Sequence, residues 1–350
     1  MSLAQDIKHK AIELGFDLAG ITDASALNNE QFELFTDWLA FGYAGRMDYM
    51  RKNLDKRTSP AKLLENAQSV ICLGLNYKPP PARGTRNERR AHRPSSIVHL
   101  PSSRPTGRVA NYAQYEDYHF FIKKQLRKLI VFISSVVGEG LQFKICVDSA
   151  PLAERALAAR AGLGFIGKNR MLINPTLGPQ IFLGEIVTDL KLQTDEPAFC
   201  HSESASADEE SLGSTTPKCA NCNKCIDACP TGALRADGQF DANKCISYLT
   251  IEYKGRIPPD LAEKIGDHLF GCDECVLACP YQEDAPVCRN KQFKFYSDRA
   301  KLDLHEILSR GRPACLPYNF DADFADSAIK RLGLDRLKRN AQICLTNITR

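Results

Sequence analysis

Eight of the 14 cysteines in this 350-residue chain lie in one window of 61 residues, between Cys219 and Cys279. A chain this long does not need disulfides to hold a core, and its charged N-terminus does not suggest a secretory leader. The expected setting is therefore a reducing cytoplasm, where clustered cysteines bind metal or carry out redox chemistry. The other six are interpreted as small buried side chains: Cys72, Cys146, Cys200, Cys288, Cys315 and Cys344.

The spacing of the eight clustered cysteines predicts two 4Fe-4S clusters. A CxxCxxCxxxCP run begins at Cys219 and a CxxCxxxCP run begins at Cys272, with Cys245 between them. In the ferredoxin run the fourth cysteine ligates the other cluster of the pair. Structural zinc with four cysteine ligands is the alternative. The cross-over rule predicts one ligand set of Cys219, Cys222, Cys225 and Cys279. It predicts a second set of Cys229, Cys245, Cys272 and Cys275.

An electron-transferring module of this size does not account for the residues before it, so an active site is expected there. Asp148 follows a predicted strand and precedes a predicted helix, which suits either a general acid or a helix N-cap. Gly162, Gly164 and Gly167 match the dinucleotide-binding string, but they follow a predicted helix rather than a strand. We therefore interpret these glycines as a turn or as a close approach of the backbone to a bulky cofactor.

The elements that position these residues are predicted from apolar periodicity. Strands are expected at 17–21, 69–75, 142–147 and 181–188, and helices at 4–14, 116–137 and 151–161, with Phe120 on the apolar side of the long helix. The fold class is an α/β (α+β) front domain, then a bacterial ferredoxin-like module with two 4Fe-4S clusters, then a short helical segment. The expected boundaries are 1–192, 218–290 and 291–350.

Charge patterning marks two further segments. Residues 193–217 contain six acids and five serines, which indicates a flexible acidic linker. Residues 83–108 contain seven arginines and are expected to form an exposed basic insertion, either as a solvated loop or as a contact for phosphate. The net charge of +4 is too small to diagnose nucleic-acid binding by itself. No apolar run approaches the roughly 18 residues of a membrane span.

Several stretches resemble the epoxyqueuosine reductase family. They are VDSAP at 147–151, AGLGFIGKN at 161–169, FLGE at 182–185, CISYLTIEYKG at 245–255 and SAIKR at 327–331, together with the eight cysteines. The resemblance implies a cytoplasmic, cobalamin-dependent oxidoreductase that reduces epoxyqueuosine to queuosine at the wobble position of tRNA anticodons, the last step of queuosine biosynthesis. It implies electrons relayed through the clusters to base-off cobalamin in the front domain.

The same resemblance assigns roles to particular residues. Asp148 corresponds to the family's proton donor, which implies a raised pKa for its carboxyl, and Arg57 lies where the family contacts cobalamin. Further cobalamin contacts are expected at Lys168, Asn169, Leu172, Phe270 and Gly271. No D-x-H-x-x-G motif is present, in line with cobalamin bound without a histidine ligand.

The expected partners are a tRNA stem-loop and an external one-electron donor of the flavodoxin or ferredoxin class. A monomer that does not bind a membrane is expected. RNA phosphates would meet basic residues near 83–108 and 330–339. Two alternatives stay open on the sequence alone: a corrinoid and iron–sulfur reductive dehalogenase, and a non-catalytic ferredoxin-type electron carrier.

Overall fold

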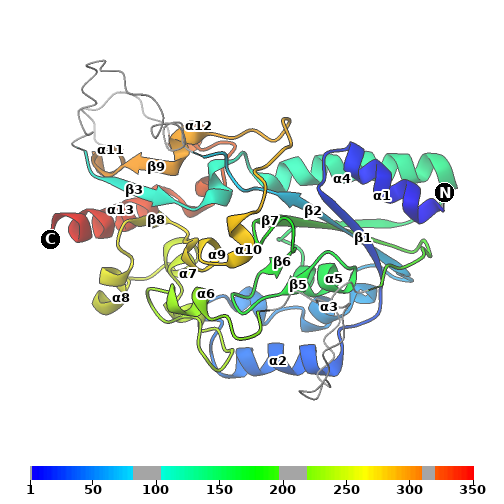
Figure 1. The fold of residues 1–350 in the computed structure, drawn as a ribbon, viewed down its shortest axis with the longest axis horizontal. Helices are drawn as coiled ribbons and strands as arrows, with labels where there is room; N and C mark the ends of the chain where they lie inside the picture. The colour runs from blue at the N-terminus through cyan, green and yellow to red at the C-terminus, as the bar shows by residue number, and fades with distance from the viewer. Residues whose placement is uncertain (1, 82–103, 197–218, 310–319) are drawn as a thin grey trace. The chain divides into compact units, whose positions relative to one another are not determined.

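The computed structural model describes residues 2–81, 104–196, 219–309 and 320–350. Figure 1 shows the helices and strands in chain order, coloured by residue number. Chain segments of the described residues group into two units. Unit 1 comprises 1–77, 118–243 and 274–290, and unit 2 comprises 78–117, 244–273 and 291–350. The units interleave along the chain, whereas the sequence-based boundaries follow chain order, so the predicted ferredoxin module contributes residues to both. In the described ranges, no helix has the length and apolar character needed to cross a membrane.

A four-stranded antiparallel sheet forms the centre of unit 1. Its order is β1 (Leu18–Asp23), β2 (Ser69–Asn76), β7 (Ile181–Thr188) and β4 (Phe143–Cys146). Every residue of β2 and β7 is buried, as expected for apolar strands covered on both faces. These are the four predicted strands, and their boundaries differ from the expected ones by two residues at most.

Helices cover the two faces of this sheet. On one face lie α1 (Leu3–Glu13) and α4 (Tyr118–Val137), and a Cβ on Gly184 of β7 would come within 2.6 Å of Ile122 in α4. On the other face α5 (Glu154–Arg160) contacts β1, β2 and β7. Phe120 is 72% exposed, so its predicted place on the apolar side of α4 is wrong. The buried stripe begins one residue later, at Phe121, and continues through Ile122 and Leu126.

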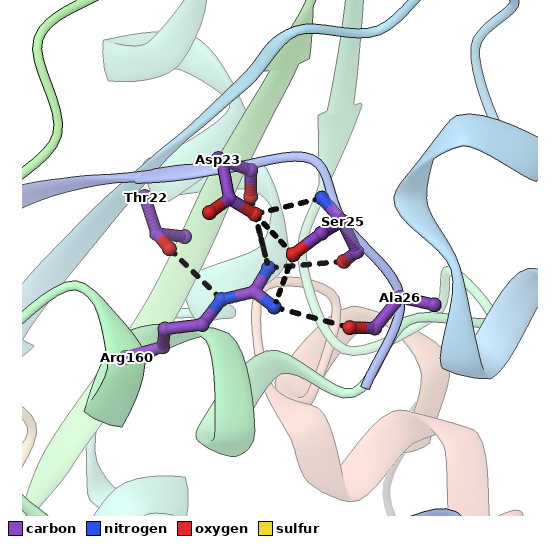
Figure 2. Close-up of polar contacts among 5 residues, drawn as sticks. All are labelled: Thr22, Asp23, Ser25, Ala26 and Arg160. Atoms are coloured by element: carbon purple, nitrogen blue, oxygen red, sulfur yellow. Dashed lines mark hydrogen bonds and ion pairs between the residues drawn. The ribbon is translucent and has the colours of Figure 1, made fainter. Parts of the chain in front are cut away.

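The last residue of α5, Arg160, ties this helix to the chain after β1 (Figure 2). Its Nε donates to Thr22 Oγ1 at 2.9 Å, and its terminal nitrogens donate to the Asp23 carbonyl at 2.9 Å and to Ser25 Oγ at 3.0 Å. Gly20 lets the backbone approach closely here, because a Cβ would lie 2.2 Å from the Ala161 carbonyl oxygen. The helix that begins at Glu154 is thereby fixed against the sheet.

Short elements complete unit 1. They are α2 (Asn29–Ala40), α3 (Leu54–Thr58), α6 (Lys224–Asp227), α9 (Glu274–Leu277), α10 (Pro280–Glu283) and the hairpin of β5 (Phe165–Ile166) with β6 (Leu172–Ile173). Phe165 and Ile173 from this hairpin pack against Cys279 in a small apolar cluster. The hairpin therefore lies directly beside the cysteine segments.

Unit 2 is built on a three-stranded sheet with the order β8 (His268–Phe270), β3 (Thr106–Val109) and β9 (Lys301–Asp303). Its helices are α7 (Ile246–Ile251), α8 (Pro259–Lys264), α11 (Leu304–Ser309), α12 (Phe320–Asp323) and α13 (Leu334–Thr349). The C-terminal segment is largely helical, as predicted, although β9 was not foreseen.

Strand β3 corrects the predicted exposed insertion at 83–108. Gly107 is buried, and Arg108 forms an ion pair with Asp267 at 2.6 Å. A basic residue inside a strand looks like part of a basic loop when only composition is considered. Residues 82–103 of the insertion and 197–217 of the predicted acidic linker lie outside the described residues. The start of that linker is anchored, because Asp195 forms an ion pair with Lys8 at 2.5 Å and accepts from the Ile21 backbone N–H.

Candidate functional site

The first predicted ligand set comes together within unit 1. Cys219 and Cys222 are joined by a tight turn, in which the Cys222 N–H donates to the Cys219 carbonyl at 2.7 Å. Cys279 is buried and packs with Cys219 in the same apolar cluster. Burial, and then the proximity of the other thiols, raises the pKa of Cys225 and of Cys279. Four sulfur atoms that influence one another in this way fit the ligands of one cluster.

Two residues of the β5–β6 hairpin hold these cysteine segments. The Lys168 backbone N–H donates to Cys219 Sγ at 3.4 Å, and its Nζ donates to the Ala220 carbonyl at 2.8 Å and to Asn223 Oδ1 at 2.9 Å. Asn169 is buried and donates to the Cys275 carbonyl at 3.3 Å. Both side chains that the sequence assigned to cobalamin are thus used to brace the cysteine segments.

The second predicted ligand set is divided between the units. Cys229 and Cys275 belong to unit 1, and Cys245 and Cys272 belong to unit 2. Burial acts to raise the pKa of Cys229, but the N–H groups of Leu234, Thr231 and Ala233 and the Thr231 hydroxyl outweigh it and lower that pKa. Such donors stabilise a thiolate ligand. This second set stays a prediction.

No group of three or more His, Cys, Asp or Glu side chains in the described ranges is arranged to hold a single metal ion. A single zinc ion draws four sulfurs to about 2.3 Å from one centre, whereas a four-iron cluster places inorganic atoms between its cysteines.

Asp148 lies in the turn after β4 and has a left-handed backbone conformation, with φ of 53°. Its Oδ2 lies 3.2 Å from His119 Nε2 at the start of α4, and its side chain is 52% exposed. The Asp148 N–H donates to Glu154 Oε1. Because a left-handed conformation is costly for a residue with a Cβ, this bond and its surroundings must hold the turn.

The N-cap alternative for Asp148 is wrong. Helix α5 begins at Glu154, three residues after the predicted start at 151, its N-cap residue is Ala153, and no side chain caps it. Residues 147–152 form bends instead. The carboxylate of Asp148 is therefore not used on helix N–H groups and faces His119 and solvent.

Three residues beside Asp148 extend this site. Burial, and then the nearby charge of Asp148, raises the pKa of Glu154 to about 8. Arg57 is close enough to interact electrostatically with Glu154, and its carbonyl accepts from the Ala153 N–H at 3.1 Å. Its guanidinium donates to the Tyr49 carbonyl at 2.9 Å, and its buried Nε has no hydrogen-bond partner among the described residues. Arg57 was predicted from resemblance, whereas the role of Glu154 was missed.

Glu185 is the third of these residues and the second that the sequence did not reveal. It lies in β7, is fully buried, and neither of its carboxyl oxygens has a hydrogen-bond partner in the described part of the chain. Burial, and then the nearby carboxyls of Glu154 and Asp148, raises its pKa well above the ordinary value. The only sequence signal is an acid within the apolar run FLGEIV, at the face that packs on α5.

The remaining predicted contacts are mostly core residues. Leu172 is buried in the cluster that includes α5, and Phe270 is fully buried in unit 2. Gly271 has φ of 73°, and its N–H donates to Thr250 Oγ1 at 3.0 Å. Only backbone atoms of these residues remain as candidates for ligand contact. The glycine string leads from α5 into the β5–β6 hairpin, so it lacks the strand-to-helix context of a dinucleotide site, as expected.

Taken together, the fold and these residues define an iron–sulfur protein whose mixed helix-and-sheet unit also carries a carboxyl-rich site. Residues 218–282 match the family described as 4Fe-4S double cluster binding domain. Residues 57–149 match the family described as Epoxyqueuosine reductase QueG, DUF1730. The epoxyqueuosine reductase of Cyclobacterium marinum is 36% identical over 96% of this chain and 94% of its own length. The chain belongs to the epoxyqueuosine reductase family.

Two solved structures resemble the whole chain. One is an epoxyqueuosine reductase with a tRNA-Tyr epoxyqueuosine-modified tRNA stem loop, with a TM-score of 0.80, 27% identity, and coverage of 99% of this chain and 81% of that one. The other is the Bacillus subtilis epoxyqueuosine reductase, with its catalytic aspartate loop swung out of the active site. It has a TM-score of 0.78, 28% identity, and coverage of 99% and 81%.

Proposed function

We propose that this chain reduces epoxyqueuosine to queuosine at the wobble position of tRNA anticodons, the last step of queuosine biosynthesis. Membership of the family over nearly the full length supports this. The relative solved with an epoxyqueuosine-modified stem loop supports tRNA as the substrate. Such a substrate is in keeping with a cytoplasmic protein.

The observation that carries the proposal is the placement of Asp148. Its carboxyl is half-exposed at the end of β4, faces His119, and is held in a strained turn. A proton donor must reach its substrate and keep a fixed orientation, and the exposure and held turn of Asp148 support such a role. The Bacillus subtilis relative also carries a catalytic aspartate on a loop. We infer that Asp148 protonates the epoxide oxygen as a C–O bond breaks.

The cofactors proposed are two 4Fe-4S clusters and base-off cobalamin. Cys219, Cys222, Cys225 and Cys279 fit one cluster, and the proposal gives the other to Cys229, Cys245, Cys272 and Cys275. Cobalamin, when bound, supplies a strongly reducing and nucleophilic cobalt. The unpartnered Nε of Arg57 fits a donor to a polar group of that cofactor. The side chains of Lys168 and Asn169 and the Lys168 N–H already make contacts within the protein, so other backbone atoms of these residues would contact the cofactor.

The proposed partners are an external one-electron donor and the tRNA stem-loop. An external one-electron donor of the flavodoxin or ferredoxin class would reduce the clusters, and the chain would act as a monomer. Among the predicted phosphate-binding residues, Arg336 and Arg339 donate to the carbonyls of Ile251 and Leu249 near the end of α7, at 2.8 and 2.9 Å. Their guanidinium groups are thereby used within unit 2. Exposed Lys330 is the better candidate for RNA phosphate.

The test is Asp148→Asn, assayed on an epoxyqueuosine tRNA stem-loop with reduced cobalamin. Loss of the acidic proton should lower turnover by about a hundred-fold or more, because general acids typically contribute that much. Glu139→Gln, an exposed acid in the loop before β4, is the matched control and should leave turnover unchanged. Full turnover by Asp148→Asn would remove this residue from the reaction, and no turnover by the wild type would refute the proposed function.

A further inference from the structure

The proposed reaction needs two protons, and the groups around Asp148 offer a source for the second. Removing an epoxide oxygen as water takes up two electrons and two protons, and one carboxyl can give only one proton before it must be recharged. The clusters account for electrons alone. While bound substrate covers the exposed side of Asp148, the second proton must come from a group behind it, and in this respect the inference rests on the proposed function.

Two carboxyl groups lie behind Asp148, and the three together are called the carboxyl triad (Asp148, Glu154 and Glu185). Asp148 is half-exposed, Glu154 is partly buried, and Glu185 has no exposed surface. Glu154 is tied to Asp148 through the Asp148 N–H. The charge of each glutamate is sensitive to that of Asp148. The triad thus leads from solvent into the sheet.

The sheet register explains how Glu185 comes to face the triad. Glu185 is directly opposite Cys72 on β2 and Cys146 on β4. Opposed residues on paired strands project to the same face, and this face carries α5. Burial raises the pKa of Cys146 to about 12 and that of Cys72 well above its ordinary value, so both neighbours are neutral thiols. The one cation on the flanking strands, Lys144 of β4, lies at an exposed position opposite Val187 rather than opposite Glu185.

An unpartnered, fully buried carboxyl is costly, and its charged form far more so. Glu185 must therefore carry a proton at neutral pH. Glu154 is also protonated at pH 7, because its pKa of about 8 lies above that pH. The ionisable groups that face this pair are Arg57, Cys72, His119, Cys146, Asp148 and Arg155.

We propose that Glu154 and Glu185 are the proton store that recharges Asp148 during deoxygenation. Asp148 gives its proton to the epoxide oxygen and becomes a carboxylate. The Glu154 O–H bond then breaks as an O–H bond forms on Asp148, which releases this second proton to the departing hydroxide and yields water. Glu185 returns a proton to Glu154, and solvent restores the store through the exposed end of the triad. Both glutamates act through Asp148 and are positioning residues.

Glu154→Gln tests the transfer without removing the turn. The amide oxygen of glutamine can still accept from the Asp148 N–H, but the amide has no acidic proton to pass on. Single turnover should slow by about ten- to a hundred-fold. The wild-type rate should fall above about pH 8 as Glu154 loses its proton, and this fall should vanish in Glu154→Gln. A variant damaged only in structure would keep the fall.

Glu185→Gln should slow repeated turnover by about ten-fold, because Glu154 then regains its proton more slowly, while keeping the fall above about pH 8. Gln125→Leu is the matched control: Gln125 is also buried with an unpartnered oxygen, but it lies on α4, on the opposite face of the sheet. Its rate and pH profile should match the wild type. Wild-type rates in both glutamate variants would overturn the proposal.

A second measurement does not depend on turnover or on variants that fold. Infrared spectra of the ¹³C-glutamate-labelled wild type should show protonated carboxyl bands at pH 7, part of which disappear above about pH 8. Absence of any protonated glutamate band at pH 7 would overturn the store even if the enzyme turns over. If the wild type shows these bands but does not act on epoxyqueuosine, the proposed function fails while the protonated pair stands.

Discussion

The first cysteine ligand set and the carboxyl triad lie in the same unit but are assembled in different ways. Three of the four cysteines in the first ligand set come from one stretch of seven residues, Cys219 to Cys225. The triad takes its members from a turn, a helix and a strand, at positions 148, 154 and 185. Chain spacing builds the first site and sheet register builds the second. The first therefore needs only one distant residue, Cys279, whereas the second depends on the packing of α5 on the sheet.

The largest expected effect tests the one distant member of the cysteine set. Cys279→Ser should remove the first cluster, lower the iron content from about eight to about four per chain, and abolish turnover, because electrons then lack a route. Iron analysis and electron paramagnetic resonance of anaerobically purified protein measure this. Wild-type protein should also hold about one cobalt per chain after reconstitution with cobalamin.

Cys288→Ser provides the comparison, because this partly exposed thiol is nine residues further along and outside both predicted sets. It should keep its iron. Full iron content in Cys279→Ser would show that Cys279 is not needed as a ligand. The first site would then be built from the Cys219–Cys225 stretch without this distant residue.

The sequence predicts features that depend on neighbouring residues better than features that depend on tertiary packing. Strand β7 is a local pattern, and its predicted boundaries are confirmed. The cysteine spacing is local too, and the ligand sets that it predicts stay predictions. Phe120 was misplaced because one residue of helical phase decides which side a side chain takes. The triad was missed because nothing local links Glu154 to Glu185. Only the register of β7 with β2 and β4, together with the docking of α5, brings them together.

An intermediate effect concerns the stability cost of the triad. A glutamate whose pKa is about 8 in the folded state and 4.5 in the unfolded state keeps its proton longer when folded. The folded state therefore binds more protons between these values, and stability falls as pH rises from about 4.5 to about 8. Glu154→Gln removes this dependence. The gain over wild type should reach about 3 kcal/mol above pH 8, less than the full shift implies because part of the side chain meets solvent.

Thermal unfolding at about pH 6 and about pH 9 measures this difference, with Glu139→Gln as the exposed control. The Glu139→Gln curve should follow the wild type at both values. Equal pH dependence in Glu154→Gln and wild type would mean that Glu154 is not held protonated. The triad would then not lower the free energy of unfolding.

The smallest expected effect concerns how firmly the hairpin braces the cysteine segment. Lys168→Met keeps the backbone N–H that donates to Cys219 Sγ but removes the two bonds from Nζ to Ala220 and Asn223. Lost bonds of this kind cost about 1 kcal/mol, so iron loss to a chelator should quicken by a few-fold. The reduction potential of the cluster should change little, because it is set partly by the N–H to sulfur contact, which remains.

Lys224→Met is the control, because it removes an exposed lysine beside Cys225 without changing the bonds of Lys168, and it should match the wild type. If both variants lose iron equally fast, positive charge near the cluster is what matters. If only Lys168→Met does so, chain spacing alone does not complete the first site, and it too relies on tertiary contacts, though far less than the triad does.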